Sequence, residues 1–98
     1  MADLSFSWDP RKARTNHEKH GVSFEEAQTV FFDEHAVLID DPDGSVAEDR
    51  FLILGLSAAL RLLTVCHCLR GDGDEIRIIN ARRADKFERR QYWERLAR

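Results

Sequence analysis

The chain has 98 residues, of which 43% are hydrophobic and 34% are charged, and its formal net charge is −3. This length and composition suit one globular domain, residues 1–98, that buries a single core without disulfide or metal staples. The longest apolar stretch, Phe51 to Leu56, is far shorter than the roughly 20 residues of a membrane span, and no signal peptide is recognised, so we expect a cytoplasmic protein.

The N-terminal segment predicts a strand followed by a helix. Residues 4–8 alternate apolar and polar side chains, as a half-buried strand does. Asp9 is the expected N-cap, and Pro10 occupies the first helical position, where its missing N–H costs nothing. This helix is expected to run to residue 19 or 20, and Gly21 supplies a left-handed stop.

A second helix begins at Ser23, which forms a capping-box pattern with Glu26. Phe24, Ala27 and Phe31 share one helical face and are expected to point into the core. Strands and a last helix follow, with turns at residues 40–44 and 71–73. The expected strands are residues 35–39, 50–56, 60–69 and 75–81, and the expected helix is residues 84–96.

The fold class predicted from this order is α+β. Because consecutive strands joined by short links pair antiparallel, we expect an antiparallel sheet flanked by two N-terminal helices and one C-terminal helix. The segments 50–56 and 60–69 are apolar on both faces, which is typical of central strands covered on both sides.

Two cysteines, Cys66 and Cys68, stand two residues apart in a predicted strand. Their side chains would point to the same face, which is poor geometry for a mutual disulfide. His67 would point to the opposite face, and no second ligand pair follows, so neither a metal site nor any other cofactor is predicted. Buried reduced thiols are the expected state.

The charge is unevenly distributed along the chain. Residues 1–76 carry 7 Lys/Arg and 15 Asp/Glu, whereas residues 77–98 carry 8 Lys/Arg and 3 Asp/Glu. Because the field of distant charges is screened, the C-terminal segment is able to bind anions although the whole chain is acidic. The candidate cations are Arg77, Arg82, Arg83, Lys86, Arg89 and Arg90. Four of them, Arg82, Lys86, Arg89 and Arg90, follow at roughly one helical turn each and are expected to form a basic ridge. A solvated helix face is the alternative interpretation of the same pattern.

Each candidate catalytic residue has two interpretations. Arg50 and Arg77 interrupt apolar strands and face either a cleft or a structural salt bridge. His67 is either a packed strand residue or a catalyst. Glu88 and Tyr92, four residues apart on the last helix, are either acid–base groups or surface and core-edge residues. RNA cleavage through the 2′-hydroxyl needs only a base, an acid and cations near the phosphate.

Two blocks of the sequence resemble the BrnT-type toxin family. The first is Phe6-Ser7-Trp8-Asp9-Pro10-Arg11-Lys12-Ala13 with Asn16 and then Lys19-His20-Gly21-Val22-Ser23-Phe24-Glu25-Glu26-Ala27. The second is Ile76-Arg77-Ile78-Ile79-Asn80-Ala81-Arg82-Arg83-Ala84 followed by Glu88-Arg89-Arg90-Gln91-Tyr92. The resemblance covers essentially the whole chain. It implies a RelE-like fold, metal-independent RNA cleavage that arrests translation, and neutralisation by a ribbon-helix-helix antitoxin of the BrnA type.

With this resemblance, the expected function is that of the endoribonuclease toxin of a type II toxin–antitoxin system. Arg50, Arg77 and Arg82 are the expected phosphate and transition-state ligands. His67, Glu88 and Tyr92 are the expected proton-transfer groups, and Arg83, Lys86, Arg89 and Arg90 the expected RNA-binding residues. Operator DNA is expected to be bound only through the antitoxin. The rival hypothesis is a catalytically weak or inactive module that binds its antitoxin and takes part in operon autoregulation.

Overall fold

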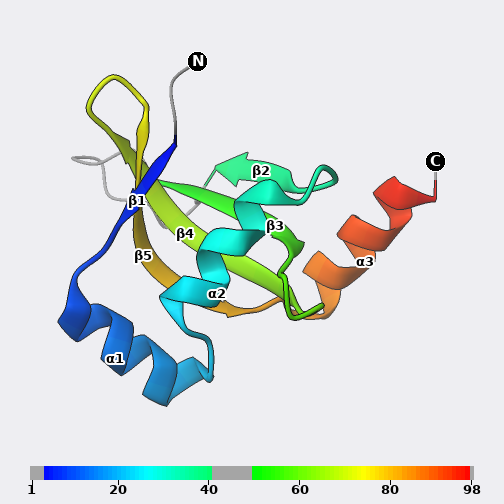
Figure 1. Cartoon of the computed structure of the whole chain (residues 1–98). Coiled ribbons are helices and arrows are strands. Elements are labelled where there is room, and N and C mark those ends of the chain that lie inside the picture. The colour runs from blue at the N-terminus through cyan, green and yellow to red at the C-terminus, as the bar shows by residue number, and fades with distance from the viewer. Residues whose placement is uncertain (1–3, 41–49, 98) are drawn as a thin grey trace.

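The computed structural model describes residues 4–40 and 50–97, which form a five-stranded sheet with helices packed against it (Figure 1). The predicted turn at 40–44 lies, from residue 41 onward, outside the described residues. The elements are β1 (Ser5–Ser7), α1 (Pro10–His20), α2 (Phe24–Thr29), the 3-10 helix η1 (Val30–Phe32), β2 (Val37–Asp40), β3 (Phe51–Leu56), β4 (Leu62–Arg70), β5 (Glu75–Arg83) and α3 (Lys86–Leu96).

The sheet has the strand order β1-β5-β4-β3-β2. Strands β2 to β5 form an antiparallel meander, whereas β1 pairs parallel with β5, with Ser5 opposite Glu75 and Ser7 opposite Arg77. The α+β class is as predicted, but the sheet is mixed rather than antiparallel. Short links make consecutive strands pair antiparallel, but β1 is separated from the meander by two helices, and this long connection allows parallel pairing.

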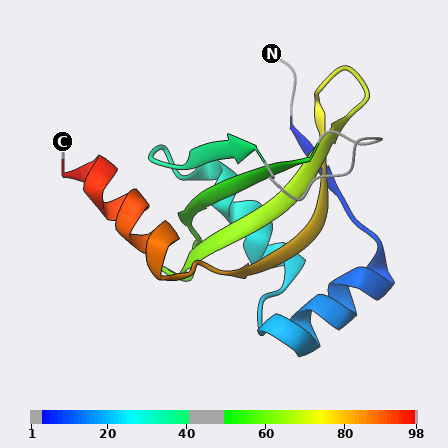
Figure 2. The same ribbon diagram turned by 180° about the vertical axis from the view of Figure 1, so that it is seen from behind.

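Both faces of the central strands are covered. In β3, Ile53 belongs to a core cluster with α2, whereas its neighbour Leu54 belongs to a second cluster with α3; Figure 2 shows the sheet from the side opposite α2. The apolar character of both faces of β3 and β4 is therefore explained. The first cluster contains Val22, Phe24, Ala27, Val30, Ile53, Leu63, Val65, Ile76, Ile78 and Ala81; the second contains Val37, Leu54, Ala84 and Tyr92.

Several predicted element boundaries were wrong. β2 begins at Val37 rather than at residue 35, and β5 ends at Arg83 rather than at residue 81. Leu60 lies in the β3–β4 turn, not in a strand, and has a φ of 61°, the left-handed region that glycine usually occupies. Hydrogen bonds from Leu60 N to Ser57 O (2.9 Å) and from Ser57 N to Arg61 O (2.8 Å) close this turn. The last helix begins at Lys86 rather than at residue 84, because the Asp85 side chain caps it and forms a capping box with Glu88.

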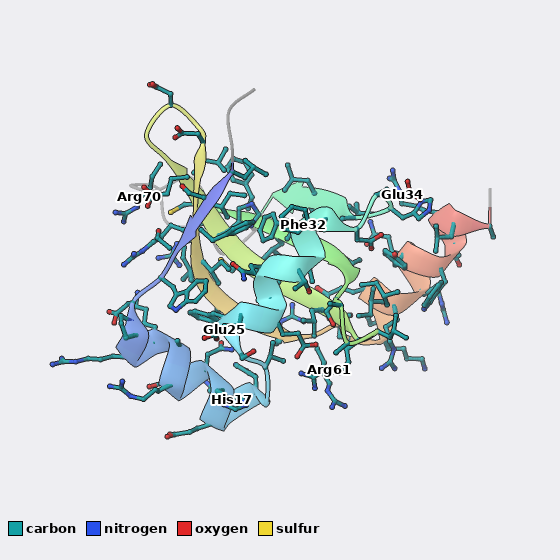
Figure 3. All side chains as sticks on the ribbon, in the orientation of Figure 1. His17, Glu25, Phe32, Glu34, Arg61 and Arg70 are labelled. Carbon is teal, nitrogen blue, oxygen red and sulfur yellow. The ribbon has the colours of Figure 1, made fainter. Side chains whose placement is uncertain are left out.

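An ion pair between Glu26 and Arg61 holds the β3–β4 turn against α2; Arg61 is labelled in Figure 3. The Ser57 hydroxyl also donates to Glu26 (2.7 Å), and Arg61 donates to the Gly21 carbonyl (3.0 Å). The hydrogen bond from Arg61 lowers the pKa of Glu26 against the opposing effect of burial. These contacts therefore stabilise the turn, and they keep the Glu26 carboxylate ionised and bound to its partners.

The carboxylate of Asp33 joins η1, β3 and α3. It accepts hydrogen bonds from Leu56 N (2.8 Å), His35 N (3.0 Å) and the Tyr92 hydroxyl (2.6 Å). Burial alone would raise the pKa of Asp33, but these donors lower it. Gly55 permits this approach, because a Cβ there would lie 2.9 Å from Val30 Cγ1 and 3.1 Å from the Asp33 carboxylate. Asp33 thus anchors α3 through Tyr92.

Cys66 and Cys68 are buried, and neither forms a disulfide, as predicted. Both lie in β4, the central strand of the five-stranded sheet. None of the helices in the described part of the chain has the length and apolar character that a membrane span requires.

Removal of the Tyr92 hydroxyl tests the anchor of α3. Tyr92→Phe keeps the buried ring and loses one hydrogen bond to a charged group, so we expect a loss of about 1.5–3 kcal/mol of unfolding free energy. Gln91→Ala, at an exposed position on the same helix, is the matched control and is expected to change stability little. Urea denaturation measures both variants; equal stability of Tyr92→Phe and wild type would contradict the anchoring role.

Candidate functional site

A pocket of about 510 Å³ opens between α1 and β5. Figures 1 and 2 show α1 and β5 on the side of the sheet away from the edge strand β2. The lining residues are Arg11, Lys12, Thr15, Asn16, Lys19 and His20 of α1 and Ile79, Asn80 and Arg82 of β5. Among these described lining residues, four are Lys or Arg and none is Asp or Glu. The pocket is therefore cationic within an acidic chain, and it suits a polyanion.

Helical spacing explains why these cations lie together. Residues 11, 15 and 19 form one row at i, i+4 and i+8 on α1, and residues 12, 16 and 20 form the adjacent row. Both rows line the pocket. This surface was not predicted from the sequence, where residues 19 and 20 were considered only as the end of the helix. The periodic placement of cations along residues 11–20 was the available signal.

The side chain of Asn16 fixes α1 against the edge of β5. It is 6% exposed, and its amide donates to the carbonyls of Val22 and Ala81 (both 2.9 Å) while its oxygen accepts from Ala81 N (3.0 Å). The amide thus pairs with β5 as another strand would, beyond the point where β1 ends at Ser7. This geometry holds the two rows of α1 beside β5 and forms the pocket wall.

Arg82 lies on β5 at the pocket and is bound by α3. Its Nη1 and Nη2 donate to the two carboxylate oxygens of Glu88 (2.8 and 3.0 Å), and Nη1 also lies 3.3 Å from the Arg83 carbonyl. Among the described residues, these contacts use three of the five N–H donors that an arginine carries. The structure brings the predicted pair Arg82 and Glu88 together, as an ion pair.

The Glu88 carboxylate accepts hydrogen bonds from donors besides Arg82. It accepts from Thr64 Oγ1 (2.9 Å) and from Asp85 N (2.8 Å). Burial would raise the pKa of Glu88, but the hydrogen bonds from Arg82, Asp85 and Thr64 lower it. A carboxylate stabilised in its ionised form is a weak proton acceptor, so this geometry favours a structural role for Glu88.

Two other predicted proton-transfer groups lie in the interior. His67 is 3% exposed, its ring packs edge-on against Phe31 at a centroid distance of 4.8 Å, and burial lowers its pKa. Tyr92 is 2% exposed, and burial together with the hydrogen bond to Asp33 raises its pKa to about 12. Neither residue lines the cationic pocket. Their surroundings match the packed interpretation of each.

The remaining predicted residues are distributed around the sheet. Arg50 is half-buried immediately before β3, and Arg77 is half-buried on β5, in register with Cys68. Arg83 is exposed and lies near enough to Glu26 to lower the pKa of that carboxylate. The predicted RNA-binding residues Lys86, Arg89 and Arg90 lie on α3 and are exposed. Of the basic ridge predicted from the sequence, only Arg82 lines the pocket.

Within residues 4–40 and 50–97, no group of three or more His, Cys, Asp or Glu side chains is placed to hold a metal ion. The histidine that lines the pocket is His20, whose neighbours there are cations and amides.

The comparisons with known proteins agree with the resemblance noted in the sequence. The family model described as the ribonuclease toxin BrnT of type II toxin–antitoxin systems matches residues 8–88, which include α1 and β5. No curated protein matches significantly in sequence. The crystal structure of the Brucella abortus ribonuclease toxin BrnT has a similar fold, with a TM-score of 0.65 and 22% identity over 85% of this chain and 99% of that chain. The chain therefore belongs to the BrnT family of type II ribonuclease toxins.

Proposed function

We propose that this chain is an endoribonuclease toxin that binds RNA in the cationic pocket between α1 and β5 and cleaves it without a metal ion. The observation that carries this proposal is the pocket itself, in which four Lys or Arg side chains converge without a carboxylate among the described lining residues. Phosphodiesters are bound by such charge, and the family is one of ribonuclease toxins.

The proposed reaction uses the 2′-hydroxyl of the substrate as the nucleophile. This oxygen attacks the adjacent phosphorus, the bond to the 5′ oxygen breaks, and the products carry a 2′,3′-cyclic phosphate and a 5′-hydroxyl. Arg11, Lys12 and Lys19 supply positive charge to the phosphate, whose negative charge is redistributed in the transition state. Arg82, which also lines the pocket, is proposed to donate to the phosphate as well, and Arg77 of β5 is proposed to contact the RNA outside the pocket.

The protein partner implied by a type II system is an antitoxin. We propose that it is a ribbon-helix-helix protein of the BrnA type, that it supplies the contacts to operator DNA, and that the toxin alone arrests translation by cleaving RNA in the cytoplasm. Three exposed cations in the first turns of α3, Lys86, Arg89 and Arg90, are proposed to contact RNA outside the pocket.

The first test is activity with a defined chemical outcome. Induction of the chain alone in a bacterial host is expected to stop growth, and the purified protein is expected to cleave RNA in excess chelator. The new ends, analysed by mass spectrometry, are expected to be 2′,3′-cyclic phosphates. Unimpeded growth with abundant folded protein would instead favour an inactive antitoxin-binding module, and cleavage that requires added magnesium would contradict the mechanism.

The second test compares charges inside and outside the pocket. Lys12→Ala and Lys19→Ala each remove one proposed phosphate contact, so each is expected to weaken RNA binding and to lower the slope of log K against log salt by about 1. Arg95→Ala removes an exposed charge at the end of α3, outside this pocket. Fluorescence anisotropy over a salt series measures all three; an equal slope change in Arg95→Ala would place the RNA elsewhere.

The third test concerns the Arg82–Glu88 pair. Arg82→Lys and Glu88→Gln each lose part of a hydrogen-bonded pair that ties α3 to β5, so we expect each to lose about 1–3 kcal/mol of unfolding free energy at pH 7. Because the folded-state pKa of Glu88 is lowered, its ionised form stabilises the fold above about pH 4, and this contribution disappears as the pH falls.

The measurement for this pair is denaturant unfolding between pH 3 and pH 7. The stability difference between wild type and Glu88→Gln is expected to shrink below about pH 4. A difference that stays constant with pH would contradict the role of the ionised carboxylate. If Arg82→Lys keeps wild-type stability and cleaves RNA at the wild-type rate, Arg82 neither anchors α3 nor contacts the phosphate through its planar fork.

A further inference from the structure

The proposed reaction needs a group that accepts the proton of the 2′-hydroxyl. Lysine and arginine side chains carry their proton at neutral pH, and threonine and asparagine do not act as bases there. Imidazole, by contrast, changes its protonation near neutral pH. Among the described residues that line the pocket, His20 is therefore the side chain suited to accept this proton.

The position of His20 is fixed by its neighbours. It stands four residues after Asn16, so both side chains project from the same side of α1, toward β5. Asn16 is hydrogen-bonded to Ala81 on β5. The helix ends directly after His20, because Gly21 takes a φ of 70° and its N–H bonds to the His17 carbonyl. The following Val22 is fully buried. The residues before and after His20 in the chain are thus fixed, and they hold His20 at the pocket.

The other proton-transfer candidates are engaged elsewhere. His67 is buried among aromatic rings, the Tyr92 hydroxyl donates to Asp33, and Glu88 is paired with Arg82. Half-buried His20, in contrast, borders the space where four cationic side chains meet. A base next to the phosphate-binding charges is the arrangement that this reaction requires.

We infer that His20 is the general base of the cleavage reaction, an inference that rests on the proposed ribonuclease function. The neutral imidazole takes the proton of the 2′-hydroxyl as that oxygen forms its bond to phosphorus. The bond between phosphorus and the 5′ oxygen breaks, and this oxygen takes a proton from water. The resulting hydroxide removes the proton from the imidazolium, which restores His20. Arg11, Lys12 and Lys19 of the same helix and Arg82 of β5 are the charged groups that line the pocket with it.

The same helix offers a matched control. His17 lies one turn earlier on α1, is exposed, and lines a separate surface depression with Trp8, Ala13 and Glu25. Figure 3 shows His17 on the lower part of α1, with Glu25 above it at the start of α2. Replacement of His17 removes an imidazole from the same helix without changing the cationic pocket.

The experiment measures cleavage of an oligoribonucleotide in excess chelator by wild type, His20→Ala, His20→Gln and His17→Ala. Loss of a general base lowers the rate by about 10²- to 10⁴-fold. We expect this loss in both His20 variants and a rate within about twofold of wild type in His17→Ala. Binding of an uncleavable 2′-deoxy oligonucleotide and the melting temperature are expected to stay close to wild type in all variants.

Two further measurements distinguish a base from other roles. Added imidazole is expected to restore part of the rate of His20→Ala and to leave wild type unchanged. With RNA in which sulfur replaces the bridging 5′ oxygen, the leaving group needs no proton, so the loss in His20→Ala is expected to persist. If the loss disappears with the sulfur substrate, His20 is the acid and the inference is wrong.

The remaining outcomes separate this inference from the proposed function. If wild type cleaves RNA and the His20 variants cleave it equally fast, only the inference fails. If wild type does not cleave RNA at all, the proposed function fails and the inference with it. If both His20 variants are unfolded, or if they bind the 2′-deoxy oligonucleotide much more weakly, His20 has a structural or binding role and the assignment as a base is overturned.

Discussion

The hydrogen bonds between the Asn16 amide and the backbone of Ala81 determine where the cationic pocket lies. β1 covers the outer edge of β5 only as far as Ser7 opposite Arg77, so Ala81, which is in register with Val65 of β4 on one side, has no strand opposite it on the other. The buried amide supplies both a donor and an acceptor to this residue. An unsatisfied buried polar group costs free energy, so α1 is held in one register against β5. The rows of Arg11, Lys12, Lys19 and His20 are thereby placed at the pocket.

The local charge of the pocket depends on which partners the acidic side chains of the protein have. The chain carries 18 Asp and Glu against 15 Lys and Arg, which alone argues against binding a polyanion. However, Glu26 is paired with Arg61, Glu88 with Arg82, and Asp33 accepts three hydrogen bonds inside the fold. Since fields from distant charges are screened, the cations of α1 dominate the pocket. Local arrangement, not net charge, makes this surface attractive to phosphate.

Helix α3 connects the structural core to the pocket. It has little apolar surface to bury, because Phe87 is 77% and Trp93 51% exposed. Its attachment therefore depends on polar contacts of buried groups: Tyr92 with Asp33, and Glu88 with Arg82 and Thr64. The second of these contacts orients the arginine that lines the pocket. The basic residues of α3 were prominent in the sequence, yet the helix serves the site chiefly by holding Arg82.

Local signals in the sequence determined most of the secondary structure. Asp9, Pro10 and Gly21 set the ends of the first helix, Ser23 capped the second, and alternation defined the strands, because caps and periodicity act over a few residues. The family was also evident from residues 8–88. The tertiary structure alone decided that β1 pairs parallel with β5 and that the cations of α1 meet Arg82. It also decided that His67 and Tyr92 are buried and that the half-buried Glu88 accepts a hydrogen bond from Thr64, since burial and hydrogen-bond partners come from residues far apart in the chain.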